Sequence, residues 1–144
     1  MLHTSLFALL CATATGIVIA NLWYSPFLFG KLWRQESKKY IKDPEATRKK
    51  SRQMYDLFYV YLLFVAIVLG ELIFLALQFY GGDKVLVGAI TGFCLWFGIA
   101  TPILFLNYLG LGMPFKLFLL NTAYQMVSLT ITGAVLGLLF IERL

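Results

Sequence analysis

The sequence has little charge and few of the residues that build catalytic or metal sites. Charged side chains make up 13% of the 144 residues, whereas soluble domains usually carry about a quarter. Its one histidine is His3, and its two cysteines, Cys11 and Cys94, stand in separate apolar runs without a CxxC pair. There is no phosphate-binding loop, nucleophile elbow or metal-ligand cluster, and haem would need paired histidines within the spans. We therefore expect a protein without enzymatic activity, cofactor or metal.

Apolar residues dominate the composition of the chain. Hydrophobic residues make up 60% of the chain, and the mean hydropathy is +0.82. A soluble domain of this size could not bury so much apolar surface, but a helix of about 20 apolar residues crosses a bilayer. We predict an all-α membrane protein in which residues 1–144 form a single bundle of four transmembrane helices. Its spans are expected at about 4–22, 57–79, 85–106 and 115–140.

The first of these spans is expected to stay in the mature protein. It resembles the core of a signal peptide, but no Lys or Arg precedes it and its apolar stretch continues to Leu22. A cleaved signal peptide carries a basic region before a shorter apolar one. We therefore predict a retained first helix.

Most of the positive charge lies in one segment. The net charge is +5, and nine of the twelve Lys and Arg residues fall within 31–52. Loops rich in Lys and Arg stay on the cytoplasmic side of a membrane. We therefore predict that loop 31–52 is cytoplasmic and that both termini face the opposite side, in a plasma (inner) or organelle membrane. Such a cluster beside membrane helices predicts contact with anionic lipid rather than with nucleic acid.

Aromatic and turn-forming residues follow the first span. Trp and Tyr side chains favour the membrane interface because an apolar ring carries a polar tip. A serine before a proline is a typical helix start, so we expect a short interfacial helix capped by Ser25 and beginning at Pro26. The residues of this interfacial motif are Trp23, Tyr24, Ser25, Pro26, Gly30 and Trp33.

Prolines also predict where the later helices begin and bend. Asp43 and Pro44 are expected to start a helix that leaves the basic loop and continues without a break through the second span. Pro102 removes one backbone hydrogen bond and frees the carbonyl of Gly98, so we expect a kink there. The third span is expected to end in a turn over residues 107–113.

Small residues recur at intervals of four along three of the spans. In membrane helices such faces allow close approach of a second helix. The packing faces predicted in this way comprise Ala12, Gly16 and Ala20, then Gly88 and Gly92, and finally Gly133 and Gly137. The spacing is compatible both with packing inside one chain and with a homodimer.

Several polar residues fall inside the predicted spans. Glu71 is the ionisable residue that lies well within a span, and a charge there costs several kcal/mol unless it faces protein or water. Counted from the basic side, Ser128 and Thr132 reach about the same depth as Glu71. The candidate intramembrane polar site therefore comprises Glu71, Gln78, Asn121, Tyr124, Gln125, Ser128 and Thr132. It is interpreted either as a proton or cation site or as hydrogen bonding between helices.

The order of these motifs resembles a known family of small membrane proteins. The similar segments are the stretch 23–33 (WYSPFLFGKLW), Gly92-Phe93 with Trp96, and the stretches 115–118, 121–124 and 133–137. The family is called domain of unknown function 1761. The resemblance implies a four-helix membrane domain and no particular activity.

Three classes of function agree with these observations. The first, which we expect over the two alternatives that follow, is a non-enzymatic membrane subunit or scaffold that self-associates or joins a larger complex. The second is a small proton- or ion-coupled carrier or channel that uses Glu71 and the polar residues of the fourth span. The third is a binder of lipid or of another hydrophobic molecule, which the aromatic content of 17% favours.

Overall fold

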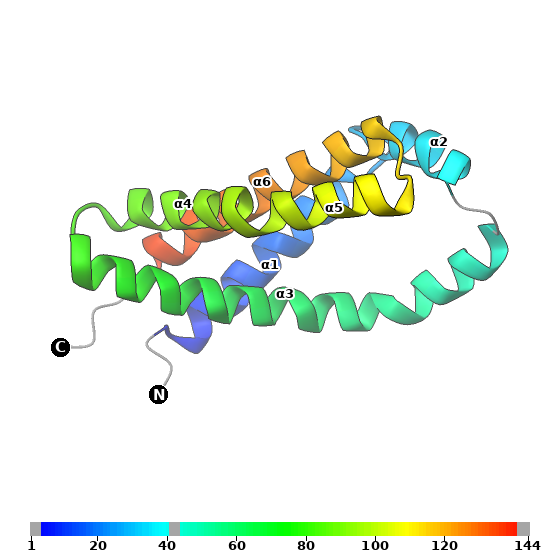
Figure 1. The fold of residues 1–144 in the computed structure, drawn as a ribbon. Coiled ribbons are helices and arrows are strands. Elements are labelled where there is room, and N and C mark those ends of the chain that lie inside the picture. The colour runs from blue at the N-terminus through cyan, green and yellow to red at the C-terminus, as the bar shows by residue number, and fades with distance from the viewer. Residues whose placement is uncertain (1–3, 41–43, 141–144) are drawn as a thin grey trace.

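The computed structural model describes residues 4–40 and 44–140, which are helical and contain no strand. The helices are α1 (Leu6–Trp23), α2 (Gly30–Tyr40), α3 (Pro44–Tyr80), α4 (Lys84–Leu95), the π-helical segment η1 (Trp96–Ala100), α5 (Thr101–Leu111) and α6 (Phe115–Leu138). Helices α4, η1 and α5 follow one another without a break and form one long rod (Figure 1). Within these ranges, side chains are described except for residues 40, 44 and 46–56.

Four helical stretches are long and apolar enough to cross a membrane. They are Leu6–Trp23, Leu57–Tyr80, Lys84–Leu111 and Phe115–Leu138. These stretches confirm the predicted number and order of spans. Their outward faces carry many exposed large apolar side chains, among them Phe7, Phe64 and Phe97. Contiguous apolar surface of this kind is unusual on a soluble protein, and lipid chains would solvate it.

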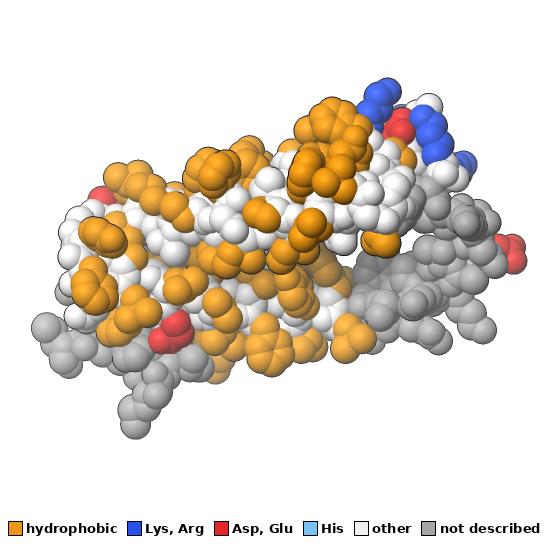
Figure 2. Space-filling model, viewed as in Figure 1, with side chains coloured by type: hydrophobic (Ala, Val, Ile, Leu, Met, Phe, Trp, Pro, Cys, Tyr) orange, Lys and Arg blue, Asp and Glu red, His pale blue; other side chains and the backbone are white. Residues whose placement is uncertain are grey.

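Helix α6 lies at the centre of the bundle, where it contacts α1, α2, α3, α4, η1 and α5. The first and last described residues lie at the same end of the bundle as the turn between α3 and α4 (Figure 1). Helix α2 and the turn between α5 and α6 lie at the other end, which we call the α2 end. The described Lys and Arg side chains visible in Figure 2 gather at the α2 end.

The closest helix contact joins α4 to α6 through the predicted glycines. A Cβ atom on Gly88 would overlap the carbonyl oxygen of Gly133, and a Cβ on Gly133 would overlap that of Gly88. One turn away on either side, Gly92 lies against the backbone of Leu129 and Gly137 against that of Lys84. The two pairs of glycines therefore pack against each other within one chain, which decides between the two arrangements that the spacing allowed.

The small-residue face of α1 is also used inside the chain. Ala12 and Gly16 are buried and Ala20 is only 8% exposed. Gly16 faces the side chain of Leu62 on α3. The core next to this face lies toward the end where the chain starts and stops, and it is formed by Ala8, Leu9, Ala12, Ala66, Leu69, Ile73 and Leu136. The bundle is thus closed and tightly packed in this half.

Two predicted boundaries are wrong. Helix α2 begins at Gly30 rather than at Pro26, because the Ser25 carbonyl accepts hydrogen bonds from Leu28 N–H and Gly30 N–H and folds the intervening residues into tight turns. Ser25 donates its hydroxyl to the Leu22 carbonyl instead of capping a helix. The third span also continues to Leu111, beyond the predicted end.

The third span ends where a left-handed glycine stops the helix. Gly112 has a φ of 66°, a conformation that glycine adopts without steric cost. The preceding Gly110 stays helical, so a glycine alone was a poor signal for the turn expected over 107–113. In contrast, the predicted helix start at Pro44 and its continuation to Tyr80 are confirmed. The predicted cap, Asp43, lies outside the described residues.

Candidate functional site

A groove of about 450 Å³ lies between α3 and the α4–α5 rod, with α6 as its floor. The α3 wall includes Phe58, Leu62 and Val65, and the opposite wall includes Ile99 and Leu104. Most of the lining is aliphatic or aromatic, and none of the described residues that line it is charged. The sequence pattern had not indicated this groove, because its walls belong to helices that are distant in the chain.

The groove exists because the helices pack closely in one half of the bundle and separate in the other. Helix α3 packs on α1, α4 and α6, whereas α5 packs on η1 and α6. Figure 1 shows α3 and α5 diverging toward the α2 end. The glycines that hold α4 against α6 end at Gly92, and beyond it the rod carries larger side chains such as Leu95 and Ile99 at the groove. Apolar walls therefore remain apart where no small residues bring the backbones together.

The wall formed by the rod contains the π-helical segment η1. Thr101 N–H donates to the carbonyl of Trp96, five residues earlier, instead of four. Isolated π-bulges of this kind occur often at functional sites. The irregularity lies directly before Pro102, where the sequence had predicted a disrupted helix. Ile99 and Ala100 of this segment line the groove.

A small polar cluster that sequence reasoning missed ties η1 to α6. The indole N–H of Trp96 donates to the Thr122 carbonyl at 2.8 Å and lies 3.3 Å from the Thr122 hydroxyl. The hydroxyls of Thr101 and Thr122 are 3.5 Å apart. A buried indole N–H usually finds a partner, but the sequence did not reveal which one. The cluster anchors the rod to the groove floor.

The floor of the groove is its most polar part. Tyr124, Gln125 and Ser128 on α6 line it, and Tyr61 on α3 lies at its edge. Tyr124 and Ser128 are buried, and the phenol of Tyr124 interacts with the Ser128 hydroxyl and lies near Tyr61. Three members of the predicted polar site thus meet in the groove.

The other members of that predicted site lie elsewhere. Glu71 and Gln78 are not among the residues that line the groove. Gln78 is exposed, and Glu71 is half-buried and makes a polar or electrostatic interaction. It follows Gly70, which packs against Thr4 at the start of the chain. Thr132 is buried beside the α4–α6 glycine contact and does not line the groove.

The separation of Glu71 from the polar floor follows from the register of α3 and α6. These helices run in the same direction, and Tyr61 lies near Tyr124 while the Phe74 and Phe140 rings stack at 6.2 Å. Glu71 therefore lies level with the last turns of α6 and not with Ser128. The sequence-based prediction compared the depths of Glu71 and Ser128 by counting residues from the basic end of each helix. In the structure α6 is displaced along α3 by more than one helical turn, so equal residue counts do not give equal depths.

Aromatic residues of the interfacial motif pack against Tyr124, which lines the groove floor. The Tyr24 ring lies 5.2 Å from the Tyr124 ring and 5.7 Å from that of Trp33, and Trp23 lies 6.3 Å from Tyr124. The Tyr24 hydroxyl donates to the side-chain oxygen of Asn121 at 3.1 Å. Burial, and then the proximity of Tyr124, raises the pKa of Tyr24 well above its usual value, so this phenol stays protonated at ordinary pH.

A glycine makes this aromatic support possible. A Cβ atom on Gly30 would overlap the carbonyl oxygens of Tyr24 and Ser25. Gly30 therefore lets the start of α2 lie directly on the end of α1, which brings Trp33 next to Tyr24. The motif thus has a structural role, and it connects the α2 end of the bundle to the groove.

No resident metal site is evident in the described ranges. Within residues 4–40 and 44–140, no group of three His, Cys, Asp or Glu side chains is placed to hold a metal ion. Cys11 and Cys94 are both free thiols. The chemistry that the groove offers is therefore apolar contact and neutral hydrogen bonding.

These features define a class of protein: a small helical protein with four candidate membrane spans, whose bundle is closed by glycines at one end and grooved at the other. Residues 7–137 match the family model described as "Protein of unknown function (DUF1761)". The chain belongs to this family, which confirms the resemblance seen in its motifs. No curated protein and no solved structure matches the chain.

Proposed function

We propose that this protein is a non-enzymatic membrane protein that binds a lipid or another membrane-soluble molecule in the groove between α3 and α5. The groove itself carries the proposal. Its volume of about 450 Å³ falls within the range of small-molecule pockets, which are also predominantly apolar with a few placed polar groups.

The groove is open on the side that would face lipid. On α3, the rim residues Tyr61 and Phe64 are 60% and 62% exposed, and on the rod Ile99 and Ile103 are 56% and 55% exposed. These side chains belong to the candidate spans, so the mouth opens sideways from the bundle. A molecule dissolved in the bilayer would enter without crossing an aqueous phase.

The geometry gives less support to the other two classes of function. The small-residue faces of α1, α4 and α6 pack within one chain, so self-association would require a different surface. Glu71 does not line the groove, so an ion pathway would lack a connection between the acid and the polar floor. Ligand binding, in contrast, requires no surface or connection beyond the groove itself.

The test is a substitution that fills the groove. Ala100 lines it, and we expect Ala100→Phe to occupy the volume that the ligand needs. Native mass spectrometry of protein extracted in mild detergent should detect a bound non-protein mass on the wild type and a loss of at least tenfold in occupancy on Ala100→Phe. Ala14→Phe is the matched control, because Ala14 is exposed on α1 and outside the groove.

Both variants must elute as monodisperse species with wild-type thermal stability for the comparison to count. If the wild type carries no ligand, or if Ala100→Phe retains as much ligand as Ala14→Phe, the proposed function is wrong. If the wild type is instead a dimer whose dissociation accompanies Ala100→Phe, the groove is a subunit interface and the proposal is also wrong.

We further infer that the α2 end faces the cytoplasm of a plasma or organelle membrane and contacts anionic lipid. The described cations of α2 are exposed there, namely Lys31, Arg34, Lys38 and Lys39. Exposed Lys and Arg beside membrane helices are retained on the cytoplasmic side and attracted to anionic headgroups. The turn between α3 and α4 would then face the other side.

Cysteine accessibility tests this orientation. In a background with Cys11→Ala and Cys94→Ala, a membrane-impermeant maleimide added to intact cells should label Asp83→Cys, in the exposed turn before α4. It should label Lys38→Cys only after lysis. Labelling of Lys38→Cys in intact cells, with Asp83→Cys protected, would reverse the assigned orientation.

A further inference from the structure

The groove combines apolar walls with neutral hydrogen-bonding groups on its floor. Resting on the proposed function, we infer that its ligand is a neutral lipid whose head is a hydroxyl or carbonyl group on a long hydrocarbon chain. The observations that carry this inference are the placement of Tyr124, Gln125 and Ser128 on one face of α6 and the absence of charge among the described residues that line the groove.

The lack of charge disfavours an ionised head. An ionised group moved from water into an apolar site costs many kcal/mol unless an opposite charge compensates it. The lining residues that the structure describes offer no such charge. A phosphate or carboxylate head would therefore lose its hydration without gaining an ion pair, whereas a hydroxyl or carbonyl head loses far less.

The polar floor supplies what a neutral head needs. Tyrosine and serine hydroxyls donate and accept hydrogen bonds, and a glutamine side chain offers both an acceptor oxygen and donor N–H groups. Tyr124 is 5% exposed and Ser128 is 6% exposed, so water competes little with a ligand there. Gln125 lies beside them on the floor and is half-buried. These groups can satisfy a hydroxyl, a ketone or an ester carbonyl.

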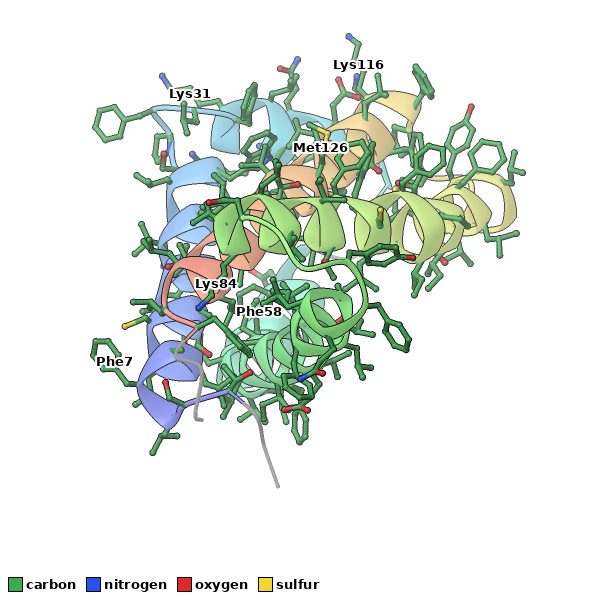
Figure 3. The ribbon with its side chains drawn as sticks, turned by 90° about the vertical axis from the view of Figure 1, so that its left-hand side faces the viewer. Phe7, Lys31, Phe58, Lys84, Lys116 and Met126 are labelled. Carbon is green, nitrogen blue, oxygen red and sulfur yellow. The ribbon has the colours of Figure 1, made fainter. Side chains whose placement is uncertain are left out.

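None of the described Lys and Arg side chains lines the groove. Figure 3, viewed along the bundle, shows Lys31 and Lys116 at the upper edge of the molecule and Phe58, which lines the α3 wall, below them near the middle of the view. Anionic headgroups and the groove ligand would therefore be bound at two separate places. The basic α2 helix and the neutral groove can select different lipids.

Three photoactivatable probes with the same hydrocarbon chain separate the contributions of chain and head. They are a long-chain alcohol, the corresponding alkyl sulfate, and the alkane without a head group, each carrying a diazirine and each added to the full protein in phosphatidylcholine vesicles. Mass spectrometry quantifies cross-links to groove peptides. We expect the alcohol to label the wild type about tenfold more than the sulfate, which corresponds to about 1.4 kcal/mol.

The floor substitutions Gln125→Leu and Ser128→Ala remove the polar groups while changing the shape little. In the double variant we expect labelling by the alcohol to fall to the level of the alkane, whose own labelling should stay at the wild-type level because it uses no polar group. The matched control is Gln78→Leu, an exposed glutamine outside the groove, which should keep the preference for the alcohol.

The probes also distinguish failure of this inference from failure of the proposed function. If Ala100→Phe blocks the alkane but the wild type labels equally with alcohol and sulfate, or prefers the sulfate, the groove binds chains and the assignment of a neutral head is wrong. If the alkane labels wild type and Ala100→Phe equally, the groove is not a binding site and both proposals are wrong. Cross-linking of the groove to a second protein chain in place of the probes would overturn both as well.

Discussion

Replacing Gly133 with alanine is expected to destabilise the bundle strongly. The new Cβ would overlap the carbonyl oxygen of Gly88, which belongs to backbone and cannot turn away as a side chain can. Overpacking of a filled core typically costs about 1–3 kcal/mol. We therefore expect a clear drop in the thermal midpoint, measured in detergent by the loss of monodisperse protein after heating.

Gly98→Ala is the matched control for this substitution. It adds the same methyl group to a helix of the same bundle, but a Cβ there meets no atom within 4 Å. Alanine also has a higher helix propensity than glycine by about 1 kcal/mol, so the control should be neutral or slightly stabilising. Equal thermal midpoints for Gly133→Ala and Gly98→Ala would contradict the close contact of α4 and α6.

Replacing Gly30 with alanine is expected to reduce both stability and ligand occupancy. A Cβ at this position would overlap the backbone carbonyls of Tyr24 and Ser25, so α2 would have to move away from the end of α1. The rings of Tyr24 and Trp33 would then separate, and Tyr124 would lose its support from behind. We expect a stability loss of about 1–3 kcal/mol.

Native mass spectrometry supplies the second readout for Gly30→Ala. Because Tyr124 forms part of the groove floor, its displacement should lower the amount of bound ligand in the surviving folded protein. The control is Gly110→Ala, since a Cβ at Gly110 meets no atom within 4 Å. Wild-type stability together with full occupancy in Gly30→Ala would show that the motif does not support the groove.

One half of the bundle is closely packed, and the other half contains the proposed binding groove. In the closed half, Gly88 and Gly133 bring two backbones into contact and Leu69 and Ile73 fill the remaining space. In the open half, α3 and α5 separate and leave the groove. Membrane helices gain little from hydrophobic burial against each other, since lipid is equally apolar. Close backbone packing in one half therefore allows the other half to stay open without loss of the fold.

The sequence predicted some of the site residues correctly and others not, for identifiable reasons. Tyr124, Gln125 and Ser128 were predicted to belong to one polar site, and they meet in the groove because residues three and four apart lie on the same side of a helix. Glu71 was assigned to the same site by counting depth on two separate helices. Trp96 and Thr122 were missed because their hydrogen bond joins residues that are distant in the chain.

What the sequence by itself determined is local. The number of spans, their approximate ends, the basic α2 end and the small-residue faces all follow from composition and spacing within single helices, because each span must satisfy its own backbone hydrogen bonds in lipid. Only the tertiary structure decided that the glycines pair within the chain, that Glu71 lies away from the polar floor, and that a groove opens beside α3. Those features depend on the register and separation of neighbouring helices, which side chains from several parts of the chain set together.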